Sequence, residues 1–283
     1  LVARVAQAAA QALHRNTPEA KKLIAKIEET QKLRKELNSV KKLARERSKA
    51  VSIRVPQLKD CKHHFDRIKQ KHLDTQIFIT EGQSAAGSLV SCRDANNQAI
   101  FTLKGKPLNV CDLNRDALYK NVEIYNLMKA LQIEENLDNL RYGQVVLATD
   151  ADVDGLHIRN LMITFFLRFF EPLVREGHLY ILETPLFRVR NKKETHYCYT
   201  EDERVAAIEK LGRSAEITRF KGLGEISPGE FKNFITPEGI RLTPVSIDGD
   251  HSTAEIINFY MGKNTPDRRE YIMNHLVVDA EML

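Results

Sequence analysis

Four short apolar runs, separated by stretches with helical patterns, are the feature that most constrains the fold of this chain. The runs lie at residues 77–79, 99–103, 145–148 and 179–182. The clearest is 145–148, where four successive apolar residues imply that both faces of a strand are covered. The intervening stretches predict helices over 84–92, 122–131 and 156–175. Strands that alternate with helices predict an α/β fold with a mainly parallel sheet and right-handed crossovers.

The two ends of the chain have a different character. Residues 1–50 contain 13 Lys/Arg against five Asp/Glu and no glycine, which predicts a basic helical segment that ends before Pro56. Because the whole chain carries +5, the remainder is mildly acidic. A basic arm of this kind is compatible with a phosphate-backbone partner, and equally with a solvated helix face. Beyond residue 188 the pattern weakens, and it predicts helices at 201–211, 252–262 and 267–276 and a strand at 215–220.

Acidic residues follow two of the predicted strands. Glu81 comes after the run 77–79, and Asp150, Asp152 and Asp154 come after the run 145–148, just before Gly155. Ligands of open parallel sheets gather at the carboxyl ends of the strands. Carboxylates crowded there repel one another unless a divalent cation compensates. Mg²⁺ favours a few carboxylates together with waters and substrate phosphates, so we expect a Mg²⁺ site.

Alternating aspartates also occur in calcium loops and at helix starts. A calcium loop of the EF-hand type would need a Glu at its twelfth position, where this chain has Leu161. It would also need a helix before the loop, where this chain has a predicted strand. A capping role at the start of the helix near Leu156 would need only one Asp. Neither accounts for the whole pattern.

A haloacid-dehalogenase-type phosphatase fits the pattern better. Residues 146–153 match its apolar strand followed by D-x-D-x-[T/V]. Lys221 could then pair with the phosphate, and Asp248 and Asp250 could complete the metal site. This alternative leaves Glu81 without a role.

Cations next to glycine suggest phosphate contacts in two turns. These turns are Lys104-Gly105-Lys106 and the segment 221–225, KGLGE. The small residues of 82–88 would also let a nucleic-acid backbone approach closely. They do not form a nucleoside-triphosphate P-loop, because the required Lys-Ser/Thr is missing.

The cysteines indicate a reduced, intracellular protein. Cys61, Cys92, Cys111 and Cys198 show no close pairing. Cys61 with His63 and His64 could begin a zinc site, but no second pair of ligands lies at a useful spacing.

Five segments, taken in order, resemble the B subunit of bacterial type IIA DNA topoisomerases, that is, gyrase and topoisomerase IV. The segments are EGQSAAGS, LKGKPLN, ATDADVDGLHIRNLMITFF, TPLFRV and RFKGLGE. The resemblance implies a TOPRIM domain at 71–190, preceded by a basic helical linker at 1–70. The remaining residues, 191–283, would complete the domain and dock the A subunit as a mixed α/β tail.

The resemblance also implies roles for individual residues. Glu81, Asp150, Asp152 and Asp154 would bind Mg²⁺, for which Mn²⁺ or Ca²⁺ can substitute. Glu81, Lys106 and His157 would be catalytic, with Glu81 serving the leaving 3′ oxygen as acid and base. Lys104, Lys106 and Lys221 would contact DNA. The family usually has an acid at the position of Gln83, which is not among the implied metal ligands.

The implied partners are double-stranded DNA and an A subunit that carries the catalytic tyrosine, in an A₂B₂ heterotetramer. The implied activity is cleavage and religation of duplex DNA. ATP would be bound only by an N-terminal domain that this sequence does not contain. We expect a cytoplasmic protein associated with the bacterial nucleoid, without contact to a membrane.

Overall fold

The computed structural model describes residues 18, 21–22, 25–28, 30–31, 55–134, 136–212, 215–247 and 252–276. The chain divides into two compact units, residues 1–53 and 54–283. In the first unit the described residues are helical, and the Thr30 hydroxyl donates to the Lys26 carbonyl one turn earlier, at 2.7 Å. The rest of the predicted basic helical segment lies outside the described residues.

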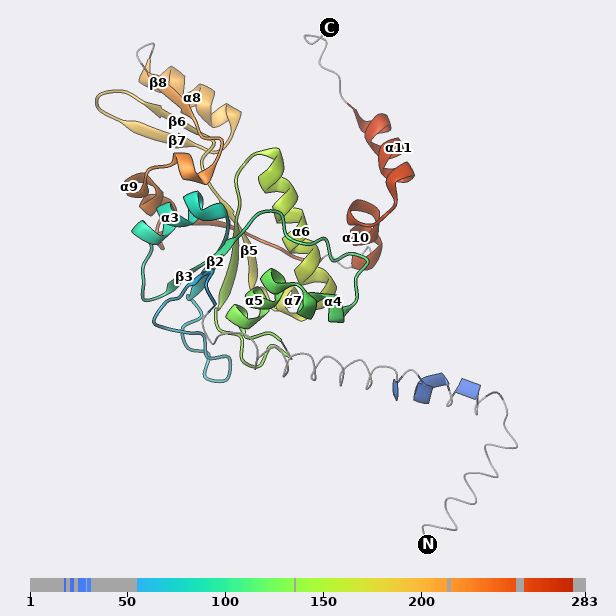
Figure 1. Cartoon of the computed structure of the whole chain (residues 1–283). Helices are drawn as coiled ribbons and strands as arrows, with labels where there is room; N and C mark the ends of the chain where they lie inside the picture. Colours follow the sequence, from blue (N-terminus) through green and yellow to red (C-terminus); the bar gives the residue numbers. More distant parts are fainter. Residues whose placement is uncertain are drawn as a thin grey trace. The chain divides into compact units, whose positions relative to one another are not determined.

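A six-stranded sheet forms the centre of the second unit (Figure 1). Its strand order is β1-β3-β2-β4-β5-β9. The four inner strands are mutually parallel, and the two edge strands run antiparallel to their neighbours. The predicted α/β class with a mainly parallel sheet is therefore confirmed. The strands are β1 (Leu58–Lys59), β2 (Gln76–Glu81), β3 (Gln98–Leu103), β4 (Gln144–Ala148), β5 (Leu179–Glu183) and β9 (Arg241–Pro244).

The connections between the parallel strands place helices on both faces of this sheet. Figure 1 shows α3 on one face and α5, α6 and α7 on the other. The helices concerned are α3 (Gly82–Cys92), α4 (Arg115–Lys120), α5 (Val122–Leu131), α6 (Val153–Phe169) and α7 (Glu171–Arg175). The chain steps from β2 outward to β3, and then returns past β2 to β4. The strand order therefore reverses between β2 and β4, which is where open α/β sheets bind their ligands.

Burial explains why the apolar runs were reliable signs of strands. Every residue of β3, and all of β2 except Glu81, is buried. Phe78, Ile100 and Val146 belong to an apolar cluster that includes residues of α3 and of the segment 220–235. Each such side chain stabilises the fold by about 1.5–3 kcal/mol relative to an exposed position.

The helix predicted over 156–175 is instead two helices. Helix α6 starts earlier, at Val153, and ends at Phe169, and α7 begins at Glu171. Phe170, between them, has non-helical dihedral angles (φ −136°, ψ 38°). Pro172 explains the break, because its ring has no N–H and clashes with the carbonyl four residues earlier in a continuous helix. No helix among the described residues has the length and hydropathy that a membrane span requires.

A second, three-stranded sheet was only partly predicted. Its order is β7-β6-β8, and only β8 and the adjoining helix α8 were expected from the sequence. The elements are β6 (Phe187–Arg190), β7 (Thr195–Cys198), α8 (Glu201–Leu211) and β8 (Glu216–Arg219). After it come η1 (Leu223–Glu225), α9 (Pro228–Phe231), η2 (Lys232–Phe234), α10 (Thr253–Met261) and α11 (Thr265–His275).

A largely buried ion pair joins this small sheet to α9. The Arg188 guanidinium on β6 donates to Glu230 of α9 at 2.6 Å, and the two side chains are 15% and 22% exposed. Tyr197 and Ser227 also donate to the Glu230 carboxylate, at 3.0 and 2.7 Å. Burial disfavours the charged carboxylate, but these three donors together keep the pKa of Glu230 below its ordinary value.

We expect Arg188→Met to destabilise the fold by about 2–4 kcal/mol, because it leaves the Glu230 charge without its cation in a largely buried place. Arg190→Met is the matched control. Its partner is Glu216 and both side chains are well exposed, so the loss should stay below about 1 kcal/mol. Urea unfolding of the three proteins measures both effects. Equal losses for the two variants would contradict a structural role of the Arg188 pair.

Candidate functional site

Glu81 and Asp150 lie at the reversal point of the sheet. Glu81 is the last residue of β2, and Asp150 follows β4 by two residues. The two strands are paired in parallel register, with Thr80 opposite Ala148, so their carboxyl ends meet at one edge. The structure therefore brings together the acids that the sequence placed after separate strands.

Glu81 has an unsatisfied carboxylate oxygen. Its Oε2 is shielded from solvent and accepts no hydrogen bond from any residue that the structure describes. Burial raises the pKa of Glu81, and the negative charges of Asp150, Asp152 and Asp154 raise it further. The charge of Lys106 acts in the opposite direction. A carboxylate in this position gains from an additional cation or from a proton.

Asp150 is held by a loop that lies far away in the sequence. The backbone N–H of Leu223 donates to Asp150 Oδ1 at 2.8 Å. A Cβ at position 222 would lie 2.7 Å from Asp150 Oδ2, so only glycine allows the loop to approach this closely. Burial raises the pKa of Asp150; the Leu223 N–H counteracts this, and the charges of Asp152 and Glu225 add to the increase.

Sequence reasoning missed this second role of the segment 221–225. Its glycines were interpreted as a turn that presents Lys221 to phosphate, whereas Gly222 and Leu223 also position Asp150. Gly155 has a comparable steric role, because a Cβ there would lie 2.2 Å from the Asp150 carbonyl oxygen. Only Gly155, which directly follows the aspartates, gave a signal in the sequence; Gly222 lies more than 70 positions from Asp150 and gave none.

Asp152 is the N-cap of α6. Its Oδ1 accepts a hydrogen bond from the Gly155 N–H at 2.8 Å. The capping role considered from the sequence is therefore present, and one aspartate fills it. The cap engages Oδ1, so Oδ2 remains the oxygen that Asp152 can offer to a metal.

Asp154 is paired with a lysine. Lys106, from the turn after β3, lies 2.6 Å from Asp154 Oδ1, and the two side chains are 48% and 64% exposed. The hydrogen bond and the charge of Lys106, together with a smaller contribution from His157, lower the pKa of Asp154. His157 is exposed in the first turns of α6. The charges of Lys106 and Asp154 thus act on Glu81, and His157 acts on Asp154.

The other sequence-predicted residues lie around the same edge. Lys104 follows β3 directly and is exposed, and its backbone N–H donates to Glu123 at 2.6 Å. Lys221 is exposed at the start of the loop that touches Asp150. Gln83 is exposed on the first turn of α3. Asp248 and Asp250, which the phosphatase alternative requires, lie outside the described residues.

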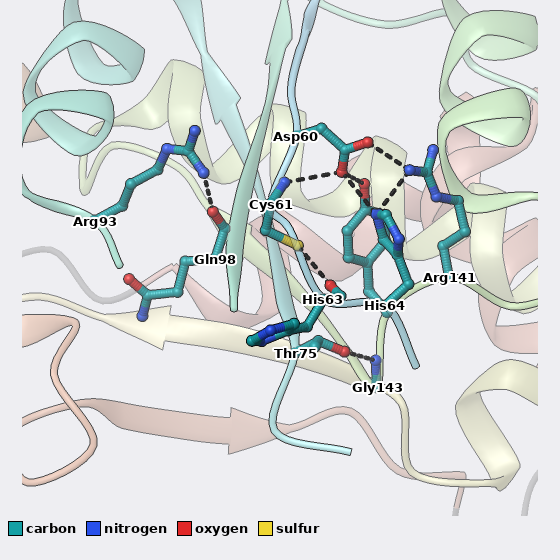
Figure 2. A network of polar contacts seen from close by, with 10 residues as sticks. Asp60, Cys61, His63, His64, Thr75, Arg93, Gln98, Arg141 and Gly143 are labelled. Atoms are coloured by element: carbon teal, nitrogen blue, oxygen red, sulfur yellow. Dashed lines mark hydrogen bonds and ion pairs between the residues drawn. The ribbon is translucent and has the colours of Figure 1, made fainter. Parts of the chain in front are cut away.

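A second cluster of possible metal ligands, around Asp60, already has a side-chain cation among its partners (Figure 2). The ligand atoms of Asp60, Cys61 and His64 lie within 4.8 Å of one another. The Arg141 guanidinium, however, contacts both the Asp60 carboxylate and His64 Nε2, and Tyr142 donates to Asp60 at 2.7 Å. Burial disfavours the charged form of Asp60, but these partners keep its pKa below the ordinary value. A permanent side-chain cation already holds this cluster together, so the structure does not support the zinc site considered from the sequence.

The contrast between the two clusters tests whether the first one fits a metal ion. Asp60 has a full set of donors, whereas Glu81 keeps a buried oxygen without one. The oxygen-only donors Glu81, Asp150 and Asp152 suit a hard cation such as Mg²⁺. The chemistry of these residues therefore fits the divalent metal that the sequence implied, although among the described residues only the Asp60 cluster brings three ligand atoms within 4.8 Å of one another.

Comparisons with known proteins match domains that include all four acidic residues. The model of the Toprim domain family matches residues 76–184, and that of the DNA gyrase B subunit carboxyl terminus matches residues 212–273. The DNA topoisomerase 4 B subunit of Borreliella burgdorferi is 57% identical over 258 residues, which are 91% of this chain and 43% of that protein. The DNA gyrase B subunit of Thermotoga maritima is 34% identical over 270 residues, 93% of this chain and 41% of that protein. The chain thus spans less than half the length of these relatives.

A solved structure has the same fold. The DNA-binding, cleavage and re-ligation domain of Plasmodium falciparum topoisomerase II superposes with a TM-score of 0.68 at 25% sequence identity. The likeness covers 81% of this chain and 33% of that chain.

Substitutions of Asp152 separate capping from metal binding. Asp152→Ala should destabilise the metal-free protein by about 1 kcal/mol, because the N-cap is lost. Asp152→Asn should keep the stability near that of the parent, because Asn caps equally well. Both variants should lose Mg²⁺ affinity, measured by calorimetry alongside urea unfolding. Parental Mg²⁺ affinity in Asp152→Asn would remove Asp152 from the ligand set.

The stability effect of Asp150 should depend on pH. Because its pKa is raised in the folded protein, the ionised group destabilises the metal-free fold at neutral pH, and the penalty disappears below the ordinary carboxyl pKa. Asp150→Asn should therefore raise Tm in EDTA at pH 7 by about 1–3 °C, with no gain below about pH 4. Asp138→Asn, which alters an exposed carboxylate outside the cluster, should show no such dependence. A lower Tm for Asp150→Asn at pH 7 would contradict the repulsion argument.

Proposed function

The chain belongs to the B-subunit family of gyrase and topoisomerase IV, and from this premise we propose that it forms the Mg²⁺-binding half of a composite DNA cleavage site. The observation that supports the proposal most directly is the buried, unsatisfied oxygen of Glu81 beside Asp150. The nucleophile is supplied by another chain, the A subunit, whose tyrosine attacks the scissile phosphate. No tyrosine of this chain is assigned that role.

In this proposal Glu81, Asp150 and Asp152 hold the metal, and Asp154 supports them. When bound, Mg²⁺ supplies Lewis-acid stabilisation of the phosphate and of the leaving 3′ oxygen. Glu81 exchanges a proton with that oxygen, a role that suits a carboxyl whose pKa is raised by burial and by neighbouring acids. Leu223 fixes the position of the Asp150 carboxylate through its backbone N–H.

The cations around the acidic edge orient the DNA. Lys104 and Lys221 contact phosphates near the scissile bond, and Lys106 and His157 act next to it. These contacts neutralise phosphate charges and release counterions, so affinity for DNA falls steeply as salt is added.

We further propose the setting in which this site works. The complete assembly is an A₂B₂ heterotetramer that acts on double-stranded DNA in the bacterial cytoplasm, close to the nucleoid. ATP hydrolysis, which drives strand passage, belongs to a separate N-terminal domain. Mn²⁺ or Ca²⁺ can replace Mg²⁺ in the site.

Reconstitution tests the proposed function. We expect this chain, mixed with a matching A subunit and linear duplex, to produce Mg²⁺-dependent double-strand breaks with protein attached to the 5′ ends. Asp150→Ala should reduce cleavage by at least about 100-fold, because it removes a ligand from the metal that stabilises charge in the transition state. Near-normal cleavage by that variant would exclude Asp150 from the site. Release of inorganic phosphate from a small ester, without any A subunit, would instead favour the phosphatase alternative.

A further inference from the structure

Lys106 places a positive charge inside the acidic cluster. Its ammonium lies 2.6 Å from Asp154 Oδ1, and its charge also acts on Glu81. We propose that Lys106 is an internal cation that competes with the divalent metal for this cluster, and that metal binding releases it to a DNA phosphate. The inference rests on the proposed function and adds to it a means by which metal loading and DNA binding are coupled.

Lys106 lies close to the carboxyl ends of both β2 and β4. It follows β3, which pairs with β2 so that Leu103 lies opposite Glu81. Its partner Asp154 lies in the first turn of α6, which follows β4. The ammonium therefore bridges the two sides of the reversal point, where a divalent ion is expected to bind. Gly105, with φ +143°, provides the backbone turn that directs Lys106 to this place.

The Lys106–Asp154 ion pair is weak enough for a divalent ion to replace the lysine. Both partners are about half exposed or more, and exposed pairs of this kind are individually weak. An ammonium carries one charge and three donors, and here it leaves the buried Glu81 oxygen unsatisfied. A divalent ion offers twice the charge and direct coordination of oxygens. Lys106 thus reduces the repulsion among the carboxylates without satisfying the whole cluster.

Arg141 is a cation that stays in its cluster permanently, and it provides a comparison for Lys106. Arg141 is 20% exposed, contacts two partners, and leaves Asp60 with a complete set of donors (Figure 2). Lys106 carries the same charge, but it is 48% exposed, pairs among the described residues with Asp154 alone and leaves Glu81 Oε2 without a donor. We conclude that Arg141 has a structural role, whereas Lys106 pairs with Asp154 only while no metal is bound.

Exchange of Lys106 has a thermodynamic consequence. If the metal displaces the ammonium from Asp154, the freed charge becomes available to a phosphate at the same edge. Linkage requires that the effect be reciprocal, so DNA that engages Lys106 tightens the binding of the metal. The cluster would then be loaded with metal chiefly when DNA is present.

Metal titration of the DNA-free chain tests the competition. Lys106→Met should bind Mg²⁺ about three- to tenfold more tightly than the parent, because a unit positive charge that would repel the ion is removed from the acidic cluster. Lys106→Arg, which keeps the charge, should stay within about twofold of the parent. Lys69→Met removes an equal charge from an exposed loop before β2 and controls for net charge. Calorimetry with MgCl₂, and Mn²⁺ titration followed by electron paramagnetic resonance, give the affinities.

A second measurement compares the DNA cleavage rate of Lys106→Met with its metal affinity, which should change in opposite directions. With the A subunit and duplex, Lys106→Met should lower the cleavage rate although it binds metal more tightly, because the phosphate contact is lost. A residue that only binds DNA would lower cleavage without changing metal affinity in the absence of DNA. Mg²⁺ affinity in Lys106→Met equal to or weaker than that of Lys69→Met would overturn the proposal.

A further variant distinguishes this failure from failure of the proposed function. Asp150→Ala must lose Mg²⁺ affinity if the cluster is the metal site at all. If it does, and Lys106→Met still binds no more tightly, then only the competition is wrong. If Asp150→Ala retains parental Mg²⁺ affinity, then the metal site itself is misplaced and the proposed function fails with it.

Discussion

Repulsion among carboxylates at one edge of the sheet is the constraint on which the rest of this site depends. The parallel pairing of β2 and β4 brings Glu81 and Asp150 together whether or not their charges are compensated. Extensive burial of the strands supplies the free energy that makes this possible. The fold thus concentrates negative charge where it can be used, and the surrounding residues supply only part of the compensation.

That partial compensation comes from two backbone N–H groups and one ammonium. A backbone N–H from Leu223 serves Asp150, the helix terminus of α6 serves Asp152, and an ammonium serves Asp154. Glu81 is left with an oxygen that nothing among the described residues satisfies. The acids are therefore not equivalent, although the sequence presents three of them as a regular alternation. Their environments, rather than their spacing, assign them different duties.

Much of the central sheet could be predicted from the sequence, because continuous apolar runs mark strands that are covered on both faces. The edge at which the acids meet followed from the same argument. The strands β6, β7 and β9 could not be predicted, since they are short and carry half-exposed, often charged residues. Nor could the contact between the 221–225 loop and Asp150, because it joins residues more than 70 positions apart and depends on backbone atoms. The glycine-flanked lysines suggested phosphate contacts from the sequence alone, whereas the role proposed for His157 comes only from the family resemblance.

The contact between Leu223 and Asp150 also determines which segments can be excised from the domain and which can change in sequence. The Toprim match ends at residue 184, yet Asp150 takes a hydrogen bond from a residue beyond it, and the apolar cluster includes Phe220 and Phe231. The contiguous segment is therefore not an autonomous module, and an excised piece would lack part of its own core. The small sheet between residues 187 and 219, in contrast, is an excursion whose chain leaves and re-enters the central unit at fixed points. Its outer parts are free to diverge as long as both junctions and the contacts of Arg188 and Tyr197 with Glu230 are kept, so the excursion can be rebuilt there without disturbing the acids.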